Sequence, residues 1–385
     1  MADASINLLI AFGSIGLFLI GMTILTEGLR GIAGDSLRRW LARFTTTPAS
    51  GIATGAVTTA IVQSSSATTI AAVGFVGAGL LTFPQALGII FGANIGTTIT
   101  GWIVAILGFK LQLGLIVQPL ILVGVLLRMF GTGRLQHVGW ALAGFGLLFV
   151  AIYSMKLAMA PYQGIITPEI LPNDSWLGRI QLVFIGMVIT VITQSSSAGV
   201  AIALVSLSTG AIALPQAAAM VIGMDIGTTF TAALATVGGG SATRRTGYAH
   251  VIYNVLTAIM ALLLLDIFAV LAEAWRNAGE MDEQIALVAF HSAFNILGAV
   301  VALPFMHAFA ALIVHLVPER GPRFLRRLDD RLLAEPAIAV EAVTTTVREL
   351  TTASLCVLDQ RLGSGNRLPV EPVTTAQLDN ACLLY

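Results

Sequence analysis

The sequence predicts an all-α polytopic membrane protein built from two inverted repeats, and three observations lead to this prediction. Of the 385 residues, 56% are hydrophobic and 10% are charged, whereas about a quarter are charged in an ordinary soluble protein. Residues 319–385 hold 17 of the 40 charges. The chain also aligns with itself after a shift of 131 residues. This composition excludes a disordered chain, a disulfide scaffold and a soluble enzyme, and zero net charge without a basic stripe argues against a nucleic-acid partner.

Long apolar stretches predict about seven membrane spans and two re-entrant hairpins. Stretches able to cross a hydrocarbon core of about 30 Å lie near residues 5–27, 83–109, 112–128, 137–155, 214–240, 246–272 and 285–316. The first lacks a positive leader region, so we interpret it as a retained membrane helix. Two further apolar regions, 46–81 and 177–212, are each interrupted by a polar cluster and are rich in Gly, Ser and Thr. They are typical of hairpins that enter and leave on one side.

Positive charges in the short loops predict the orientation. One set of alternate loops is rich in arginine, with Arg30, Arg38, Arg39, Arg43, Arg128, Arg134, Arg244, Arg245 and the group from Arg320 to Arg331. The opposite set holds only Lys110, Lys156, Arg179 and Arg276. The arginine-rich side and the C-terminus should therefore be cytoplasmic, in a chain that spans the cell (inner) membrane several times. This assignment requires both polar-centred regions to be re-entrant.

The internal repeat is the strongest signal. From the Gly55/Gly186 pair to the Thr100/Thr231 pair, 20 of 46 aligned residues are identical without a gap. Each unit reads helix, re-entrant hairpin, helix, helix, and its three crossings invert the second copy relative to the first. The predicted domains are residues 1–136, residues 137–318 with an additional C-terminal membrane helix, and an amphipathic cytoplasmic tail at 319–385. Inverted repeats with broken segments at matching positions indicate a secondary transporter with a midplane site.

The hairpin breaks carry the predicted anion site, formed by Gln63, Ser64, Ser65 and Ser66 with their copies Gln194, Ser195, Ser196 and Ser197. A polar break within the membrane survives only when it is buried in protein or lines a wet cavity. Each tip offers a helix N-terminus and three hydroxyls, which favour an oxyanion. Basic residues fall only at the ends of the apolar stretches, as Arg128 and Arg179 do. A bound dianion would then need co-bound cations, which makes coupling to Na⁺ chemically reasonable.

A second duplicated polar element follows each hairpin. It reads Asn-Ile-Gly-Thr-Thr from Asn94 and Asp-Ile-Gly-Thr-Thr from Asp225. We expect Gly96 and Gly227 to let the helices open locally and expose carbonyls beside the hydroxyls of Thr97, Thr98, Thr228 and Thr229. An ionisable residue within an apolar span is a functional candidate by default. Asp225 is therefore predicted to bind a cation or a proton, whereas its copy Asn94 is neutral.

These residues resemble the type II sodium–phosphate cotransporter family, specifically its bacterial members. The resemblance covers roughly residues 5–318 and rests on the doubled QSSS, the two G-x-[ND]-I-G-T-T elements, and His250-x-x-Tyr253-Asn254 with His291-x-x-Phe294-Asn295. It implies that phosphate binds at the QSSS turns and that Na⁺ binds near Asn94, Thr97, Thr228 and Thr231. Asp225 replaces the family's usual Asn, and Met224, Val251 and Ser292 also depart from eukaryotic patterns, so stoichiometry is not transferred. The tail resembles the start of a PhoU-like helical domain.

The residues leave other interpretations open. Another small oxyanion or dicarboxylate would suit the same donors, and an anion channel would use the same site. An intramembrane serine hydrolase would pair a QSSS serine with His250 or His291, but no G-x-S-x-G element is present, and the whole segment is duplicated although catalysis needs one nucleophile. We interpret both histidines as interhelical hydrogen-bond partners and Glu27 as a solvated or paired helix end. We therefore predict a transporter rather than an enzyme. The sequence leaves a homodimer open.

Overall fold

The computed structural model of the chain describes residues 2–77, 80–114, 116–236, 240–279, 282–318, 328, 332 and 336–362. Over these residues the chain folds into helices without any strand, which confirms the all-α prediction. The helices are α1 (Ala2–Phe44), α2 (Pro48–Val62), α3 (Ser65–Gly77), α4 (Phe83–Ile103) with its π-helical extension Val104–Lys110, α5 (Gln118–Phe130), α6 (Arg134–Met159), α7 (Trp176–Thr193), α8 (Ser196–Ser208), α9 (Leu214–Thr236), α10 (Ser241–Asn277), α11 (Glu283–Ala302), α12 (Met306–Leu316) and α13 (Pro336–Leu362).

The first helices of the two repeats, α1 and α6, pack directly against each other. A Cβ on Gly21 would lie 2.8 Å from the Leu148 amide nitrogen, and one on Gly28 would lie 2.3 Å from that of Ala141. As residue numbers rise on α1 they fall on α6, so the two helices are antiparallel. Equivalent helices of inverted repeats have this relationship. Helix α1 changes direction at Gly34, which has a left-handed φ of 51°, before it leads into α2.

Both predicted hairpins consist of two short helices separated by a sharp break. Helices α2 and α3 flank Gln63, whereas α7 and α8 flank Gln194 and Ser195. A capping box between Thr47 and Ser50 begins α2, and Pro48 occupies its first turn. The predicted breaks within 46–81 and 177–212 are therefore present as helix–break–helix units, whereas their re-entrant course through a membrane stays a prediction.

Each hairpin packs on the following helix through the same repeated glycines. A Cβ on Gly92 of α4 would lie 2.0 Å from the Ile52 carbonyl oxygen of α2, and one on Gly223 of α9 would lie 1.8 Å from that of Val183 on α7. Both pairs are related by the 131-residue shift. The next matched glycines, Gly96 and Gly227, lie against equivalent threonines of α2 and α7 in the same manner. The internal repeat is thus also a repeat of close, parallel helix contacts.

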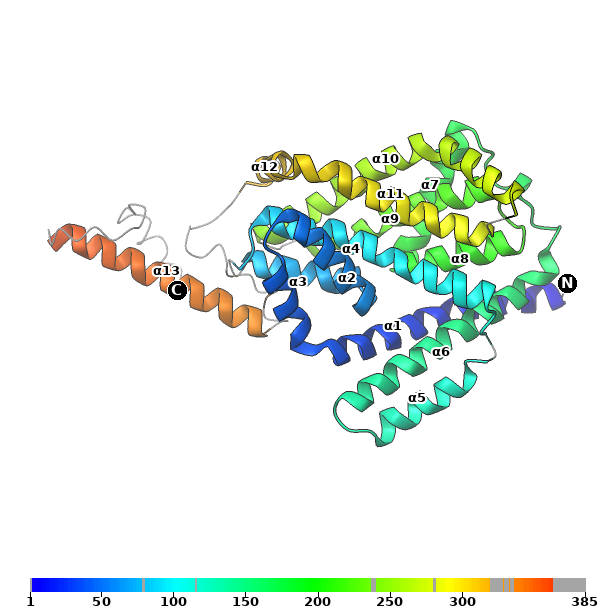
Figure 1. Cartoon of the computed structure of the whole chain (residues 1–385), viewed down its shortest axis with the longest axis horizontal. Coiled ribbons are helices and arrows are strands. Elements are labelled where there is room, and N and C mark those ends of the chain that lie inside the picture. Colours follow the sequence, from blue (N-terminus) through cyan, green and yellow to red (C-terminus); the bar gives the residue numbers. More distant parts are fainter. Residues whose placement is uncertain are drawn as a thin grey trace.

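Six helical segments of the described chain are long and apolar enough to cross a membrane. They are Ile6–Gly34, Phe83–Lys110, Arg134–Tyr162, Trp176–Thr193, Ser241–Asn277 and Glu283–Leu316. Trp176–Thr193 is among them, although its sequence predicts one limb of a hairpin. In the stretch predicted at 112–128 the helix is α5, whose 13 residues are too short to span at 1.5 Å per residue. It lies along α6 instead (Figure 1).

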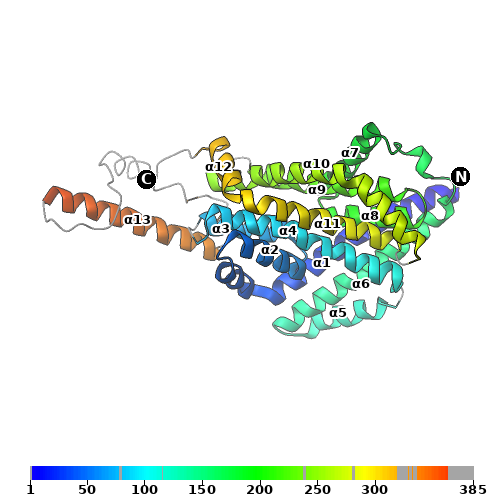
Figure 2. The same cartoon turned by 45° about the horizontal axis from the view of Figure 1, so that its top comes forward.

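Large apolar side chains cover the outside of the bundle and fill its interior. Exposed examples include Phe130 of α5, Phe184 of α7 and Leu263 of α10. A surface so rich in apolar groups suits lipid, as the membrane prediction requires. The main buried cluster lies among α1, α6, α8, α9, α10 and α11. Helices α10 and α11 run along one side of this core in both views (Figures 1 and 2).

Helix α13, within the predicted tail, projects away from the bundle (Figures 1 and 2). Its first part contacts the membrane domain. Ile338 is buried against Gly74 of α3, in a cluster with Leu41 and Phe75. The tail is therefore anchored to the second limb of the first hairpin.

Candidate functional site

Each hairpin break is made by a glutamine in the left-handed helical conformation. Gln63 has φ 55° and ψ 33°, and Gln194 has φ 54° and ψ 23°. The side-chain amide of each glutamine donates to the carbonyl oxygen three residues earlier, at 2.6 Å to Ala60 and 2.8 Å to Val191. In the first hairpin the Gln63 amide oxygen also accepts a 2.6 Å bond from Thr100 of α4. Both glutamines thus satisfy backbone groups that the break would otherwise leave without partners.

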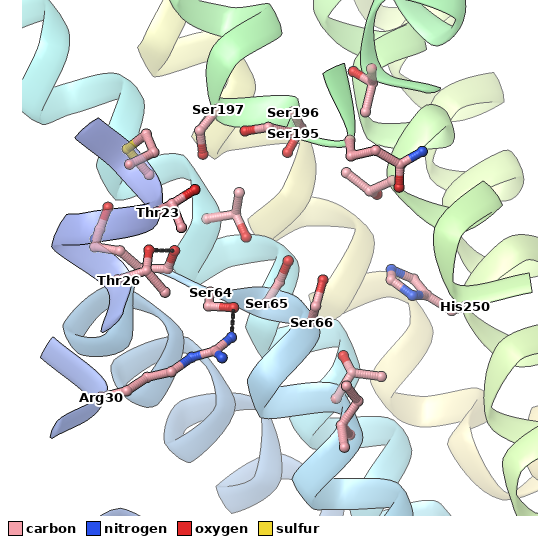
Figure 3. A pocket seen from close by; sticks show the side chains of 18 of the residues that line it. Thr23, Thr26, Arg30, Ser64, Ser65, Ser66, Ser195, Ser196, Ser197 and His250 are labelled. Carbon is pink, nitrogen blue, oxygen red and sulfur yellow. Dashed lines mark hydrogen bonds between the residues drawn. The ribbon is translucent and has the colours of Figure 1, made fainter. Parts of the chain in front are cut away.

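The two QSSS turns, 131 residues apart in sequence, meet in one cavity of about 840 Å³. All eight predicted anion-site residues line it. Figure 3 shows Ser64, Ser65 and Ser66 on one side of the space and Ser195, Ser196 and Ser197 on the other, with His250 at a third side. The tertiary structure therefore brings together the residues that the repeat singled out.

The first serine of each turn caps the helix that begins there. Ser64 Oγ accepts a 3.3 Å bond from the Ala67 amide, and Ser195 Oγ accepts a 3.2 Å bond from the Ala198 amide. The next two serines of each turn form the first residues of α3 and α8. Two helix N-termini and their hydroxyls consequently face one space, an arrangement that favours a bound anion.

An arginine also reaches this cavity, contrary to the expectation from sequence. The loop charges predict Arg30 in a cytoplasmic loop, but it lies within α1 and its Nη2 donates a 2.6 Å bond to Ser64 Oγ (Figure 3). Glu27, one turn earlier, lines the same cavity and accepts a 3.0 Å bond from Trp140 Nε1. The premise that the anion site lacks a basic side chain is therefore wrong. The sequence does hold a signal that Arg30 faces a polar site. Thr23, Thr26 and Arg30 form a polar stripe at helical spacing in an otherwise apolar helix.

The Asn-Ile-Gly-Thr-Thr and Asp-Ile-Gly-Thr-Thr elements lie on unbroken helices. Residues 94–98 are helical in α4 and residues 225–229 are helical in α9, so the expected opening at Gly96 and Gly227 is wrong. Both glycines serve close packing instead, because a Cβ there would lie 2.7 Å from the Cβ of Thr59 or Thr190. Thr97 and Thr228 line the cavity, which places one hydroxyl from each repeat beside the QSSS turns.

The remaining members of these elements are not among the residues that line the cavity, and they belong to a layer of amides and imidazoles that reaches the cavity at His250. Asn94 donates 2.6 Å to Asn254 Oδ1, and its own Oδ1 lies 3.2 Å from His250 Nε2. Asn254 in turn donates 2.7 Å to the Asp225 carbonyl oxygen. These contacts join α4, α9 and α10, and they confirm His250 as an interhelical hydrogen-bond partner.

Asp225 occupies the matching position in the second repeat and contacts α11. His291 Nε2 lies 3.0 Å from Asp225 Oδ1, and Asn295 donates 2.7 Å to Oδ2. Thr98 accepts a 2.9 Å bond from Ser292, and Thr229 donates to the Ile226 carbonyl. Residues of the two H-x-x-[YF]-N elements thus form hydrogen bonds with Asn94 and Asp225 of the two Asn/Asp-Ile-Gly-Thr-Thr elements. Only the fold reveals this link. The Thr231 side chain lies outside the described residues.

Several buried polar atoms of this region have no hydrogen-bond partner among the described residues. They are the hydroxyl oxygens of Thr69 and Thr190 beside the cavity, Nδ1 of His250 and His291, and Oδ1 of Asn295. Such atoms are costly when they stay unpaired. In the described chain, the bonded Nε2 of each histidine contacts Asn94 or Asp225 rather than a QSSS serine. The serine–histidine pairing that a hydrolase needs is therefore missing from these contacts.

Comparison with known proteins gives a consistent result. A family model described as Na⁺/Pi-cotransporter matches residues 17–157 and 174–297. The chain is 33% identical over 318 residues to the uncharacterized protein YqeW of Bacillus subtilis, covering 81% of this chain and 99% of that protein. It is 28% identical over 353 residues to YjbB of Escherichia coli, which is named as a candidate inorganic phosphate export protein; the match covers 89% of this chain but only 63% of that relative.

A shorter match reaches a mammalian protein. Over 103 residues, 26% of this chain and 15% of the relative, the chain is 34% identical to sodium-dependent phosphate transport protein 2B of Homo sapiens. No solved structure matches the chain significantly.

Proposed function

The chain belongs to the Na⁺/Pi-cotransporter family, and from this premise we propose that it moves inorganic phosphate across the cell (inner) membrane together with Na⁺, by alternating access. The observation that carries the proposal is the meeting of two QSSS turns, one from each repeat, in one cavity. Hairpins that enter from opposite sides would let two halves of the molecule open this site in turn. The proposed domains are those predicted from the sequence, namely repeats at 1–136 and 137–318 and a cytoplasmic tail at 319–385.

For the phosphate site we propose all eight QSSS residues. The serine hydroxyls and the N-termini of α3 and α8 would donate to phosphate oxygens, while Gln63 and Gln194 hold the turns in shape. These donors are neutral, so they also suit other small oxyanions. The relatives named for phosphate transport favour phosphate over sulfate or a dicarboxylate.

For Na⁺ we propose the hydroxyl and amide oxygens of the second duplicated element, with Thr97 and Thr228 as the ligands nearest the phosphate. Both line the cavity, and hydroxyl oxygens suit a hard cation. Asn94, Thr98, Asp225 and Thr229 complete the proposed set, and Thr231 stays in it as a prediction from the resemblance. In this proposal the buried bonds to His250 and His291 position Asn94 and Asp225. Na⁺ and the anion would then occupy adjacent sites and partly neutralise each other.

The deciding experiment is uptake of radiolabelled phosphate into proteoliposomes that contain the full chain, with Na⁺ and pH varied separately. We expect an inward Na⁺ gradient to drive phosphate above its external concentration. Flux that no gradient can drive uphill would indicate a channel, and covalent labelling by a fluorophosphonate would indicate a hydrolase. Ser65→Ala combined with Ser196→Ala should abolish most uptake. The matched control is Ser208→Ala at the far end of α8, where the hydroxyl bonds to the Val205 carbonyl.

Net export is a second candidate, and the specific observation in its favour is the relative from Escherichia coli that is named for phosphate export. The same liposomes, loaded with phosphate and placed in phosphate-free buffer, test this direction. Efflux that follows the Na⁺ gradient would support one reversible coupled carrier. Efflux that ignores Na⁺ would remove the coupling from the proposal.

A further inference from the structure

We propose that Arg30 is a specificity-determining ligand for the transported anion at the first hairpin, with no counterpart at the second. This inference rests on the proposed function and deepens it, because it assigns a charged donor to a site whose other proposed donors are neutral. The anion it selects has two or more acceptor oxygens and carries negative charge, as phosphate does.

The contact between Arg30 and Ser64 prepares the serine to donate. Ser64 Oγ accepts one bond from Arg30 Nη2 at 2.6 Å and another from the Ala67 amide at 3.3 Å. A hydroxyl has two lone pairs and one hydrogen. With both lone pairs engaged, Ser64 has its hydrogen left to offer, and a hydrogen donor is what an anion requires. The arginine therefore contributes both its own charge and a polarised hydroxyl.

The guanidinium suits this role by its geometry and its surroundings. A guanidinium has five N–H donors in a planar fork that fits phosphate oxygens in pairs, so a single bond to Ser64 does not exhaust it. Arg30 is the only lysine or arginine among the described residues that line the cavity. Glu27 is the acidic residue on the same face of α1, and its carboxylate is bonded to Trp140 of α6. The carboxylate thus has a neutral hydrogen-bond partner on another helix, and it also attracts the Arg30 guanidinium electrostatically.

The second repeat lacks an equivalent charge. The shift of 131 residues that relates the two halves carries position 30 to Pro161, which is uncharged. The turn at Ser195 therefore depends on hydroxyls, a helix N-terminus and any co-bound cation. An anion held mainly by the first hairpin would need Na⁺ less than an anion held mainly by the second.

The test compares Arg30→Gln and Arg30→Lys with Arg39→Gln in the full-length chain. Arg39 is a matched control because it lies on the same helix and donates 3.1 Å to a serine, Ser36, outside the cavity lining. Equilibrium binding of phosphate to the detergent-solubilised protein is measured alongside transport KM and maximal rate in proteoliposomes, and thermal stability shows that each variant folds.

We expect Arg30→Gln to weaken phosphate binding and raise KM by roughly tenfold, because it removes a charge-assisted bond, with the maximal rate nearly unchanged. Arg30→Lys should recover part of the affinity, since it restores charge without the fork, and Arg39→Gln should match the wild type. Unchanged binding in a folded Arg30→Gln variant would overturn this inference alone. A wild-type chain that neither binds nor transports phosphate would overturn both this inference and the proposed function.

Discussion

The two hairpins share one backbone design but differ in the contacts that surround it. Gln63 and Gln194 adopt the same left-handed conformation, and each donates its amide to the carbonyl three residues earlier. The first serine of each turn caps the following helix. Duplication has therefore preserved the geometry that exposes two helix N-termini to one cavity. The groups that tune charge and packing around those turns have diverged.

Three differences separate the halves. The first turn contacts Arg30, whereas the second has no matching charge. Thr59 bonds to Thr68 in the first hairpin, but position 68 corresponds to Gly199 in the second, and Thr190 has no partner among the described residues. Asn94 becomes Asp225. The first half thus has its positive charge at the turn, and the second has its acidic group behind it, so the halves are suited to different ions.

The largest expected effect tests the shared packing. Gly92→Ala and Gly223→Ala place a methyl group 2.0 Å and 1.8 Å from backbone oxygens of α2 and α7, so neither contact can relax without moving a helix. We expect each substitution to lower the free energy of unfolding by about 3 kcal/mol or more. Gly16→Ala is the control, because a Cβ there meets nothing within 4 Å. Thermal denaturation in detergent measures this, and a normal melting curve for only one of the two variants would show that the halves do not pack equivalently.

The next largest effect concerns Asp225, the acidic residue that stands in the second repeat where the first has Asn94. Asp225→Asn removes the carboxyl group that contacts His291 and Asn295. We expect the Na⁺ concentration for half-maximal uptake to rise roughly tenfold, because bonds that involve a charged group are the stronger ones. Asn94→Asp is the reciprocal variant. Uptake measured against Na⁺ at fixed pH, and against pH at fixed Na⁺, checks this, and unchanged curves would make Asp225 a structural residue.

A smaller effect should separate the two capping serines. Ser64→Ala and Ser195→Ala each lose a helix cap worth about 1 kcal/mol. Only Ser64→Ala also removes the hydroxyl that Arg30 contacts. We therefore expect similar melting temperatures but a higher KM for phosphate in Ser64→Ala. Equal KM values in the two variants would argue that the turns contribute equally despite the arginine.

The smallest effect lies in the packing behind the turns. Thr59→Val breaks the 2.9 Å bond to Thr68 and should cost about 1 kcal/mol. Thr190→Val removes a buried hydroxyl without a partner in the described chain, and should leave stability unchanged or slightly higher. Thermal denaturation measures both. A fall in phosphate or Na⁺ affinity for Thr190→Val would identify a ligand as that hydroxyl's partner.

Sequence patterns predicted the two helix breaks well because their signals are local and doubled. QSSS within an apolar Gly- and Ser-rich segment has few other structural solutions in a membrane, and its exact repetition removes coincidence. The same reasoning failed for Gly96 and Gly227. A glycine that opens a helix and one that admits a neighbouring helix look identical in sequence, and only the proximity of Thr59 and Thr190 distinguishes them.

Arg30 and the histidine contacts show a different limit of sequence reasoning. Counting loop arginines treats Arg30 as a marker of orientation, although α1 continues past it and carries it beside Ser64. Asn94 and His250 are 156 residues apart, and no spacing rule connects them. Local chemistry along the chain sets the membrane class, the repeat and the two breaks, because hydrophobicity, glycine content and polar interruptions act over a few turns. The packing of α1, α10 and α11 against the repeats decides which charge and which imidazole reach the site, because those contacts depend on the relative placement of whole helices.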